Sequence, residues 1–120
     1  MKRLGAVRGA TQCLNDERDI ADQVSALYDA LLGANALSEE DLVSVIFSMT
    51  KDLNAKNPAS ALRQSGRARN AALFTVQEAE IQGGLERVIR VLIHCYLEEE
   101  PCHVYRNGAE ALRPDRASKG

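Results

Sequence analysis

Residues 88 to 97 read Val-Ile-Arg-Val-Leu-Ile-His-Cys-Tyr-Leu, and this run decides most of what the sequence says about the fold. Its density of valine and isoleucine favours a β-strand over a buried helix. Side chains alternate along a strand, so Arg90 and His94 share one face while the other face packs against the core. The apolar neighbours of Arg90 predict an anion beside it, because an unpaired buried guanidinium costs on the order of several kcal/mol.

Two helices are expected on the N-terminal side of this run. Apolar residues recur every three or four positions between Ile20 and Leu32, which predicts a long helix capped by Asn15 or Asp16 and ended by Gly33. A proline at the first helical position marks the start of a second, short helix. That helix begins after Asn57 and ends at Gly66.

Four further strands are expected, and Asn107-Gly108 makes the last of them irregular. Ser38 and Asp41 resemble a capping box and allow at most one helical turn before the second strand. The strands cover residues 3–8, with Arg8 at or near the C-terminal end, then 42–49, 71–76 and 103–112. Together these patterns predict an α+β (α/β-like) domain of about five strands with one long and one short helix.

Composition excludes several classes of protein. The 120 residues form one domain that is small for enclosing an enzyme pocket alone, so assembly is expected. A net charge of -2, without a basic block, argues against nucleic-acid binding. No run approaches the ~20 apolar residues of a membrane span, and the N-terminus lacks a signal pattern, which predicts a cytoplasmic protein. We expect one domain over residues 1–114 and a flexible tail over 115–120.

The three cysteines are expected to be reduced thiols. His94-Cys95 and Cys102-His103 bracket Pro101 and could be imagined as a zinc site. Neither adjacent pair has the usual spacing of zinc ligands, so the sequence does not favour a metal.

Most of the candidate functional side chains in the sequence are arginines. The sequence has neither a phosphate-binding glycine loop followed by lysine nor an evident nucleophile-base pair. The planar guanidinium fork suits carboxylates, so Arg8, Arg63, Arg90 and Arg113 could hold a small polyanion. The alternative is structural ion pairing with Glu78, Glu80 or Asp52, and the residues alone do not separate the two.

Several short blocks, in their order and spacing, resemble the monofunctional, non-helical chorismate mutase family. The blocks are Val7–Thr11, Gln77-Glu78, Gly83–Leu85 leading to Ile89–Val91, His103–Tyr105 and Leu112–Asp115. The resemblance implies the Claisen rearrangement of chorismate to prephenate, the shikimate-pathway step toward phenylalanine and tyrosine. It also implies a homotrimer resembling a pseudo-α/β barrel, with sites between subunits, and no cofactor or metal.

The same resemblance assigns roles to five residues. Arg90 would contact the ether oxygen and the enolpyruvyl carboxylate, Arg8 would hold the same side chain of the substrate, and Tyr105 would donate a further hydrogen bond. Glu78 would accept a hydrogen bond from the ring hydroxyl and keep Arg90 oriented. Thr75 would line the same wall.

A second set of residues would come from the neighbouring subunit, and two of them depart from the family. An aromatic is usual where Asn57 stands and a lysine where Ser60 stands, so weaker substrate binding is expected; Arg63, Arg67 and Arg113 are the candidates to replace the missing charge. Leu112 and Arg113 could close over the site as a flap. The neighbour's set comprises Asn57, Ala59, Ser60, Arg63, Leu73 and Phe74.

Two alternatives to an enzyme stay open at this point. The first is a non-catalytic trimeric binder of a small dicarboxylate, which is consistent with the departures from the family at Asn57 and Ser60. The second is an interaction module on the same scaffold, because a fold alone does not assign function.

Overall fold

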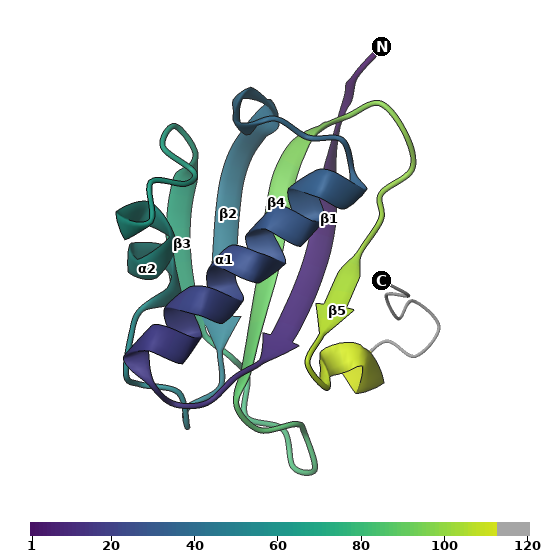
Figure 1. Cartoon of the computed structure of the whole chain (residues 1–120). Helices are drawn as coiled ribbons and strands as arrows, with labels where there is room; N and C mark the ends of the chain where they lie inside the picture. Colours follow the sequence, from purple (N-terminus) through teal and green to yellow (C-terminus); the bar gives the residue numbers. More distant parts are fainter. Residues whose placement is uncertain (113–120) are drawn as a thin grey trace.

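The computed structural model describes residues 1–112, which form a five-stranded sheet with two helices on one face (Figure 1). This arrangement confirms the predicted number of strands and helices. None of the helices in the described range is long and apolar enough to cross a membrane. In chain order the elements are β1 (Arg3–Gln12), α1 (Glu17–Ala34), the 3-10 turn η1 (Glu39–Asp41), β2 (Leu42–Met49), α2 (Pro58–Gln64), β3 (Ala72–Gln77), β4 (Val88–Leu97), β5 (Val104–Arg106) and the 3-10 turn η2 (Ala109–Leu112).

Strand β4 is the centre of the sheet, whose strand order is β3-β2-β4-β1-β5. It pairs antiparallel with β1 and with β2, and the outer strands β5 and β3 pair parallel with β1 and β2. The predicted strand over residues 88–97 is confirmed along its whole length. Its alternation is also confirmed, because every second side chain is buried on the helix side, at Ile89, Val91, Ile93, Cys95 and Leu97.

Helix α1 covers the sheet with a buried stripe that is apolar apart from the hydroxyl of Tyr28. Asp16 caps its N-terminus by accepting a hydrogen bond from the backbone N–H of Asp19 at 3.0 Å. The helix approaches β1 closely at Gly9, where a Cβ atom would lie 2.8 Å from the carbonyl oxygen of Val104 and 3.0 Å from the Leu27 side chain. The buried residues of the stripe are Ile20, Val24, Leu27, Tyr28 and Leu31.

A polar network fixes the far end of α1. The Tyr28 hydroxyl donates a hydrogen bond to Glu39, whose carboxylate also accepts from the backbone N–H of Ala68 at 3.0 Å. Burial, followed by the hydrogen bond to Glu39, raises the pKa of Tyr28 well above its usual value. The network ties α1, η1 and the segment before β3 together.

The sheet face opposite the helices carries a mixture of exposed apolar and polar side chains, and we call it the open face. Strand pairing places the members of this face in one surface. Leu4 and Phe74 are each 63% exposed and Tyr96 is 45% exposed, which is a large apolar exposure for one sheet face. The open face comprises Leu4, Ala6, Arg8, Ala10, Ser44, Ile46, Ser48, Ala72, Phe74, Val76, Arg90, Leu92, His94, Tyr96 and Tyr105. Two of them, Ala10 and Tyr105, are buried in a small cluster with Ala109 of η2.

Two predicted element boundaries are wrong. β1 continues to Gln12, so Arg8 lies inside the strand; Gly9 does not end the strand but provides room for α1. The last strand spans only Val104–Arg106, because Asn107 and Gly108 both adopt positive φ, of 51° and 96°, and turn the chain into η2. The predicted tail over 115–120 lies outside the described residues.

Candidate active site

An ion pair at the end of β3 joins two of the residues expected to do chemistry. The Nε atom of Arg90 lies 3.3 Å from Oε2 of Glu78. The backbone N–H of Glu78 donates to the carbonyl oxygen of Met49 at 2.9 Å, which extends the pairing of β3 with β2 by one residue. Ser48 stands directly opposite Arg90 on β2, and its hydroxyl donates to Oε1 of Glu78. The carboxylate is therefore held at both oxygens.

Arg90 differs from expectation in one respect. The anion that the sequence predicted is present as Glu78, but the guanidinium is not buried: 48% of the Arg90 side chain is exposed, against 20% for Glu78. Its apolar sequence neighbours point to the opposite side of the sheet, and Arg90 itself is on the open face. Within residues 1–112 the single ion-pair partner of Arg90 is Glu78 through Nε, so its outer nitrogens form no second ion pair.

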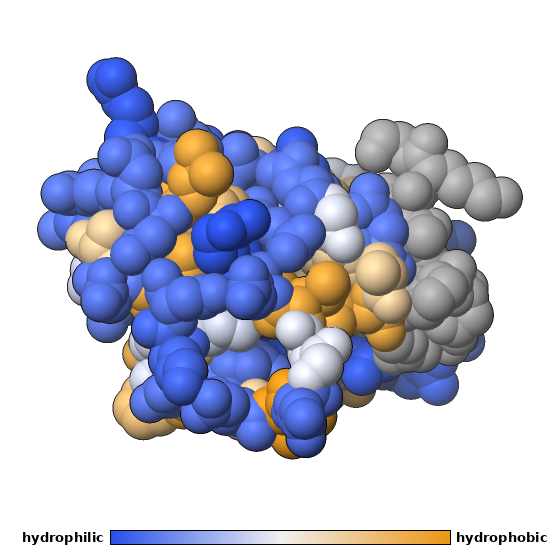
Figure 2. Space-filling view, turned by 90° about the horizontal axis from the view of Figure 1, so that it is seen from below, coloured by the Kyte–Doolittle hydropathy of each residue, from blue (hydrophilic) through white to orange (hydrophobic). Residues whose placement is uncertain are grey.

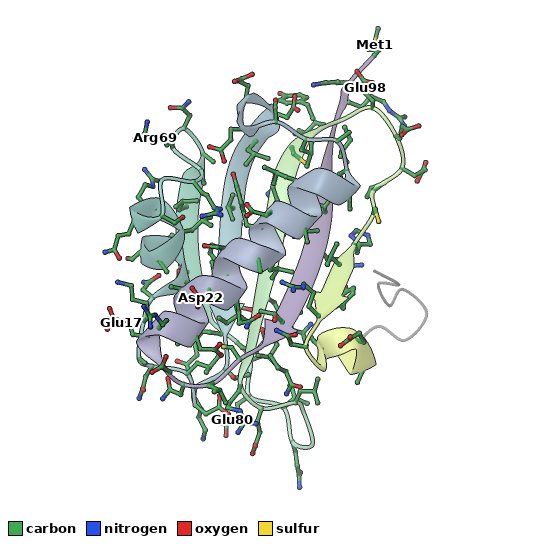
Figure 3. The ribbon with its side chains drawn as sticks, viewed as in Figure 1. Met1, Glu17, Asp22, Arg69, Glu80 and Glu98 are labelled. Carbon is green, nitrogen blue, oxygen red and sulfur yellow. The ribbon has the colours of Figure 1, made fainter. Side chains whose placement is uncertain are left out.

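A pocket of about 670 Å³ lies beside this pair. It occupies the end of the molecule seen in Figure 2, where apolar side chains are exposed between polar ones, and Glu80 marks the same end in Figure 3. The ammonium of Lys51 pairs with Glu80 at 2.7 Å on its wall. The lining residues are Thr50, Lys51, Asp52, residues 78–86, Val88, Arg90 and Leu112.

Hydrogen bonds between β2 and β4 hold the base of the pocket. The Thr50 hydroxyl accepts from the backbone N–H of Val88 at 3.0 Å and donates to Asp52. The Asp52 carboxylate in turn accepts from the backbone N–H of Arg87, a residue with a positive φ of 51°. This network fixes the point at which the loop over residues 78–87 enters β4, two residues before Arg90.

Arg8 and Tyr105 lie on the same side of the sheet as Arg90, but Tyr105 is only 5% exposed and packs in a small apolar cluster with Ala10, Val88 and Ala109. Ala10 is the register partner of both Arg90 and Tyr105, so Tyr105 lies two strands from Arg90 on the same surface, at about 10 Å by strand spacing. Arg8 stands opposite Leu92 on the neighbouring row. Its backbone N–H donates to Nδ1 of His103 at 3.0 Å, which fastens the start of β5 to β1. All four residues expected to act on one substrate therefore occur on one side of one chain.

The residues expected from a neighbouring subunit lie elsewhere. Asn57 caps α2: its Oδ1 accepts from the backbone N–H of Ala59 at 2.9 Å and of Ser60 at 3.4 Å, and from the Thr75 hydroxyl at 2.9 Å. Thr75 is paired with the buried Phe47 and so faces the helices, not Arg90. Within one chain Thr75 therefore lies beside Asn57 rather than beside Glu78, and its place in the substrate site stays a prediction.

Two of the three arginines that could replace the family's lysine already have partners within the chain. Arg67 binds Asp29 through two nitrogens, at 2.9 and 2.8 Å. Arg63 donates to the carbonyl oxygen of Ala71 at 3.2 Å. Arg113 lies outside the described residues. Of the apolar pair on β3, Leu73 packs on the helix side and Phe74 points to the open face.

Sequence reasoning missed Ser48, whose hydroxyl holds Glu78, and Lys51, which lines the pocket. A weak signal existed for Ser48: the run Leu42–Met49 is apolar apart from Ser44 and Ser48, which lie four residues apart and so share one face of the strand. The contact partners of Ser48 and Lys51 lie far away in the sequence, so no local pattern could predict them.

The imagined zinc site does not form in the described part of the chain. His94 and Cys95 project to opposite faces of β4, and Cys102 is exposed in the following loop. No group of three or more potential metal ligands occurs within residues 1–112. All three cysteines are free thiols.

Comparison with known proteins gives one consistent result. The family model for chorismate mutase type I matches residues 4–116. The chain is 32% identical to chorismate mutase AroH of Bacillus subtilis over 113 residues, covering 91% of this chain and 89% of the relative. It is 38% identical to chorismate mutase AroH of Thermus thermophilus over 117 residues, covering 93% and 95%.

The fold gives the same result. A solved structure of chorismate mutase from Clostridium thermocellum superimposes with a TM-score of 0.84 at 37% identity, covering 89% of this chain and 98% of that one. Family model, relatives and solved structure all span most of the chain, and they agree with the resemblance of the short sequence blocks. The chain belongs to the type I chorismate mutase family.

Proposed function

We propose that this protein is a chorismate mutase, which rearranges chorismate to prephenate in the biosynthesis of phenylalanine and tyrosine. The observation that carries the proposal is the geometry of Arg90: Glu78 holds its Nε atom while its outer nitrogens remain available beside a pocket. The family match supports the reaction itself, since the relatives that the chain resembles are named chorismate mutases.

The reaction makes two physical demands on the protein. In this Claisen rearrangement the ether C–O bond breaks and a new C–C bond forms within one molecule, so the electrons redistribute around a ring of six atoms. The enzyme must hold the flexible dicarboxylate in its compact conformer, and it must stabilise the negative charge that builds on the ether oxygen. Fixed cationic donors satisfy both demands.

The proposed roles follow from these demands. Arg90 donates to the ether oxygen and to the enolpyruvyl carboxylate, and Arg8 contributes charge from the adjacent row of the open face. Tyr105 donates a hydrogen bond from two strands away. Glu78 accepts from the ring hydroxyl and keeps Arg90 in place, a role supported by its 3.3 Å contact with Nε.

We further propose a homotrimer whose sites lie between subunits. Two features support it: the open face exposes several large apolar side chains, and the residues of α2 lie on the helix side of the sheet, opposite the face that carries Arg90 (Figure 1). A neighbouring copy would bring its Asn57, Ala59, Ser60, Arg63, Leu73 and Phe74 toward the pocket, with Leu112 as part of the cover. A cytoplasmic location stays a prediction.

The non-catalytic binder is not favoured, since the relatives that span nearly the whole chain are named as mutases. Turnover decides between the two. Purified protein is mixed with chorismate, and the loss of chorismate absorbance is followed together with the appearance of prephenate. We expect conversion; folded protein that is protected from heat by chorismate but converts none of it would be a binder and would refute the mutase proposal.

A further inference from the structure

Among the side chains of residues 1–112, Ser48 and Arg90 are the two that contact the carboxylate of Glu78. Its hydroxyl donates to Oε1, while Nε of Arg90 contacts Oε2. Ser48 is also the register partner of Arg90 across the β2–β4 pair, so all three side chains meet on the open face. The three groups form a chain of contacts, Ser48 to Glu78 to Arg90, which we call the clamp.

We infer that Ser48 is a positioning residue for the rearrangement, acting on Arg90 through Glu78. The inference rests on the proposed function. The final torsion of a glutamate side chain is broad, so a single contact to Arg90 would leave its carboxylate free to rotate. The hydroxyl of Ser48 supplies the second anchor, and it comes from a rigid central strand.

The anchor matters because the carboxylate has two tasks. It must accept the ring hydroxyl of the substrate, and it must hold the Nε edge of Arg90 so that the outer nitrogens face the ether oxygen. A carboxylate that rotates can also take those outer nitrogens in a bidentate pair, which arginine and carboxylate favour. That alternative pair would compete directly with the substrate, and Ser48 opposes it by holding Oε1 on the side of β2.

The chain provides a matched control on the same strand. Ser44 lies on the same face of β2, is half-buried like Ser48, and makes its own cross-strand hydrogen bond, 2.9 Å to Nδ1 of His94. Replacing either serine by alanine removes the same atoms from the same kind of position. Only Ser48 contacts Glu78.

The experiment compares Ser48→Ala, Ser48→Thr and Ser44→Ala in chorismate turnover, and repeats Ser48→Ala in a Glu78→Ala background. We expect Ser48→Ala to lower kcat about tenfold, mostly without change in KM, because the lost alignment matters most in the transition state. Ser48→Thr, which keeps the hydroxyl, should recover most of the rate. Ser44→Ala should stay within about twofold of the wild type.

The double variant distinguishes positioning from general support of the fold. If Ser48 acts through Glu78, removing it should have little further effect once Glu78 is alanine. Equal losses for the two serines, or full additivity with Glu78→Ala, would overturn the inference. A wild-type protein without turnover would instead overturn the proposed function and this inference with it, and the wild-type assay shows that separately.

Discussion

Replacing Ile46 by glutamate should dissociate the proposed trimer. Ile46 lies in the middle of the open face, between Phe74 of β3 and Leu92 of β4. Burying an isoleucine side chain in an interface contributes about 1.5–3 kcal/mol, and an unpaired carboxylate in its place costs several more. Counting only the lost isoleucine burial, at about 3 kcal/mol for each copy, three copies lose about 9 kcal/mol, or roughly six orders of magnitude in the association constant.

Sedimentation velocity measures this loss directly, with circular dichroism to confirm that the variant folds. Leu14→Glu is the control, because Leu14 is 64% exposed but lies in the loop between β1 and α1, away from the open face. We expect the wild type and Leu14→Glu to sediment as trimers, and Ile46→Glu as an inactive monomer. An Ile46→Glu protein that sediments as the wild type does would refute the assignment of the open face to the contact between copies.

Three further predictions concern single side chains. Asn57→Ala should lower the free energy of unfolding, measured in urea, by about 2 kcal/mol, about half from the helix cap and half from the lost Thr75 hydrogen bond. Asn57→Asp keeps an oxygen acceptor and should retain most of the stability. A loss under about 0.5 kcal/mol in Asn57→Ala would contradict the capping role. Ser60→Lys should lower KM for chorismate by restoring a positive charge, and an unchanged KM would count against the missing-charge interpretation. Tyr28 has a raised pKa, so the neutral phenol stabilises the fold below about pH 10 and this contribution is lost as pH rises further. Tyr28→Phe should therefore flatten the alkaline fall in unfolding free energy, and an unaltered pH profile would argue against this cause.

The central strand was predictable because both of its faces follow from the sequence. One face of the run carries only apolar residues from Ile89 to Leu97, and these are buried as expected, while the other face includes Arg90 and His94. The exposure of Arg90 was not predictable in the same way. Its nearest sequence neighbours are apolar, but they belong to the opposite face of the sheet, so they say little about the surroundings of the guanidinium.

Errors at the ends of elements have a common physical cause. Gly9 resembles a strand end in sequence, yet it sits within β1 because Leu27 and the backbone of Val104 approach too closely for any Cβ. That requirement comes from the tertiary packing of α1 and β5. The length of the last strand was overestimated because a local feature decides its end: Asn107 and Gly108 form a turn despite the apolar residues around them.

The contacts of the candidate site also fall into a part that was expected and a part that depends on tertiary packing. The pairing of Glu78 with Arg90 was expected from family resemblance and is present in the structure. The contact of Ser48 with Glu78 depends on the register between β2 and β4, which are joined by a long intervening segment. Register of that kind follows from packing, so no local pattern revealed it.

The most direct measurement is chorismate turnover by the wild type beside Arg90→Ala and the control Arg69→Ala. Arg69 is exposed at the opposite end of the molecule from Glu80 (Figure 3). Loss of one preorganised donor to the transition state costs roughly 2.7–4 kcal/mol, so kcat of Arg90→Ala should fall by about a hundredfold to a thousandfold. Arg69→Ala should retain nearly full activity. An Arg90→Ala enzyme that turns over chorismate at the rate of Arg69→Ala would contradict the account.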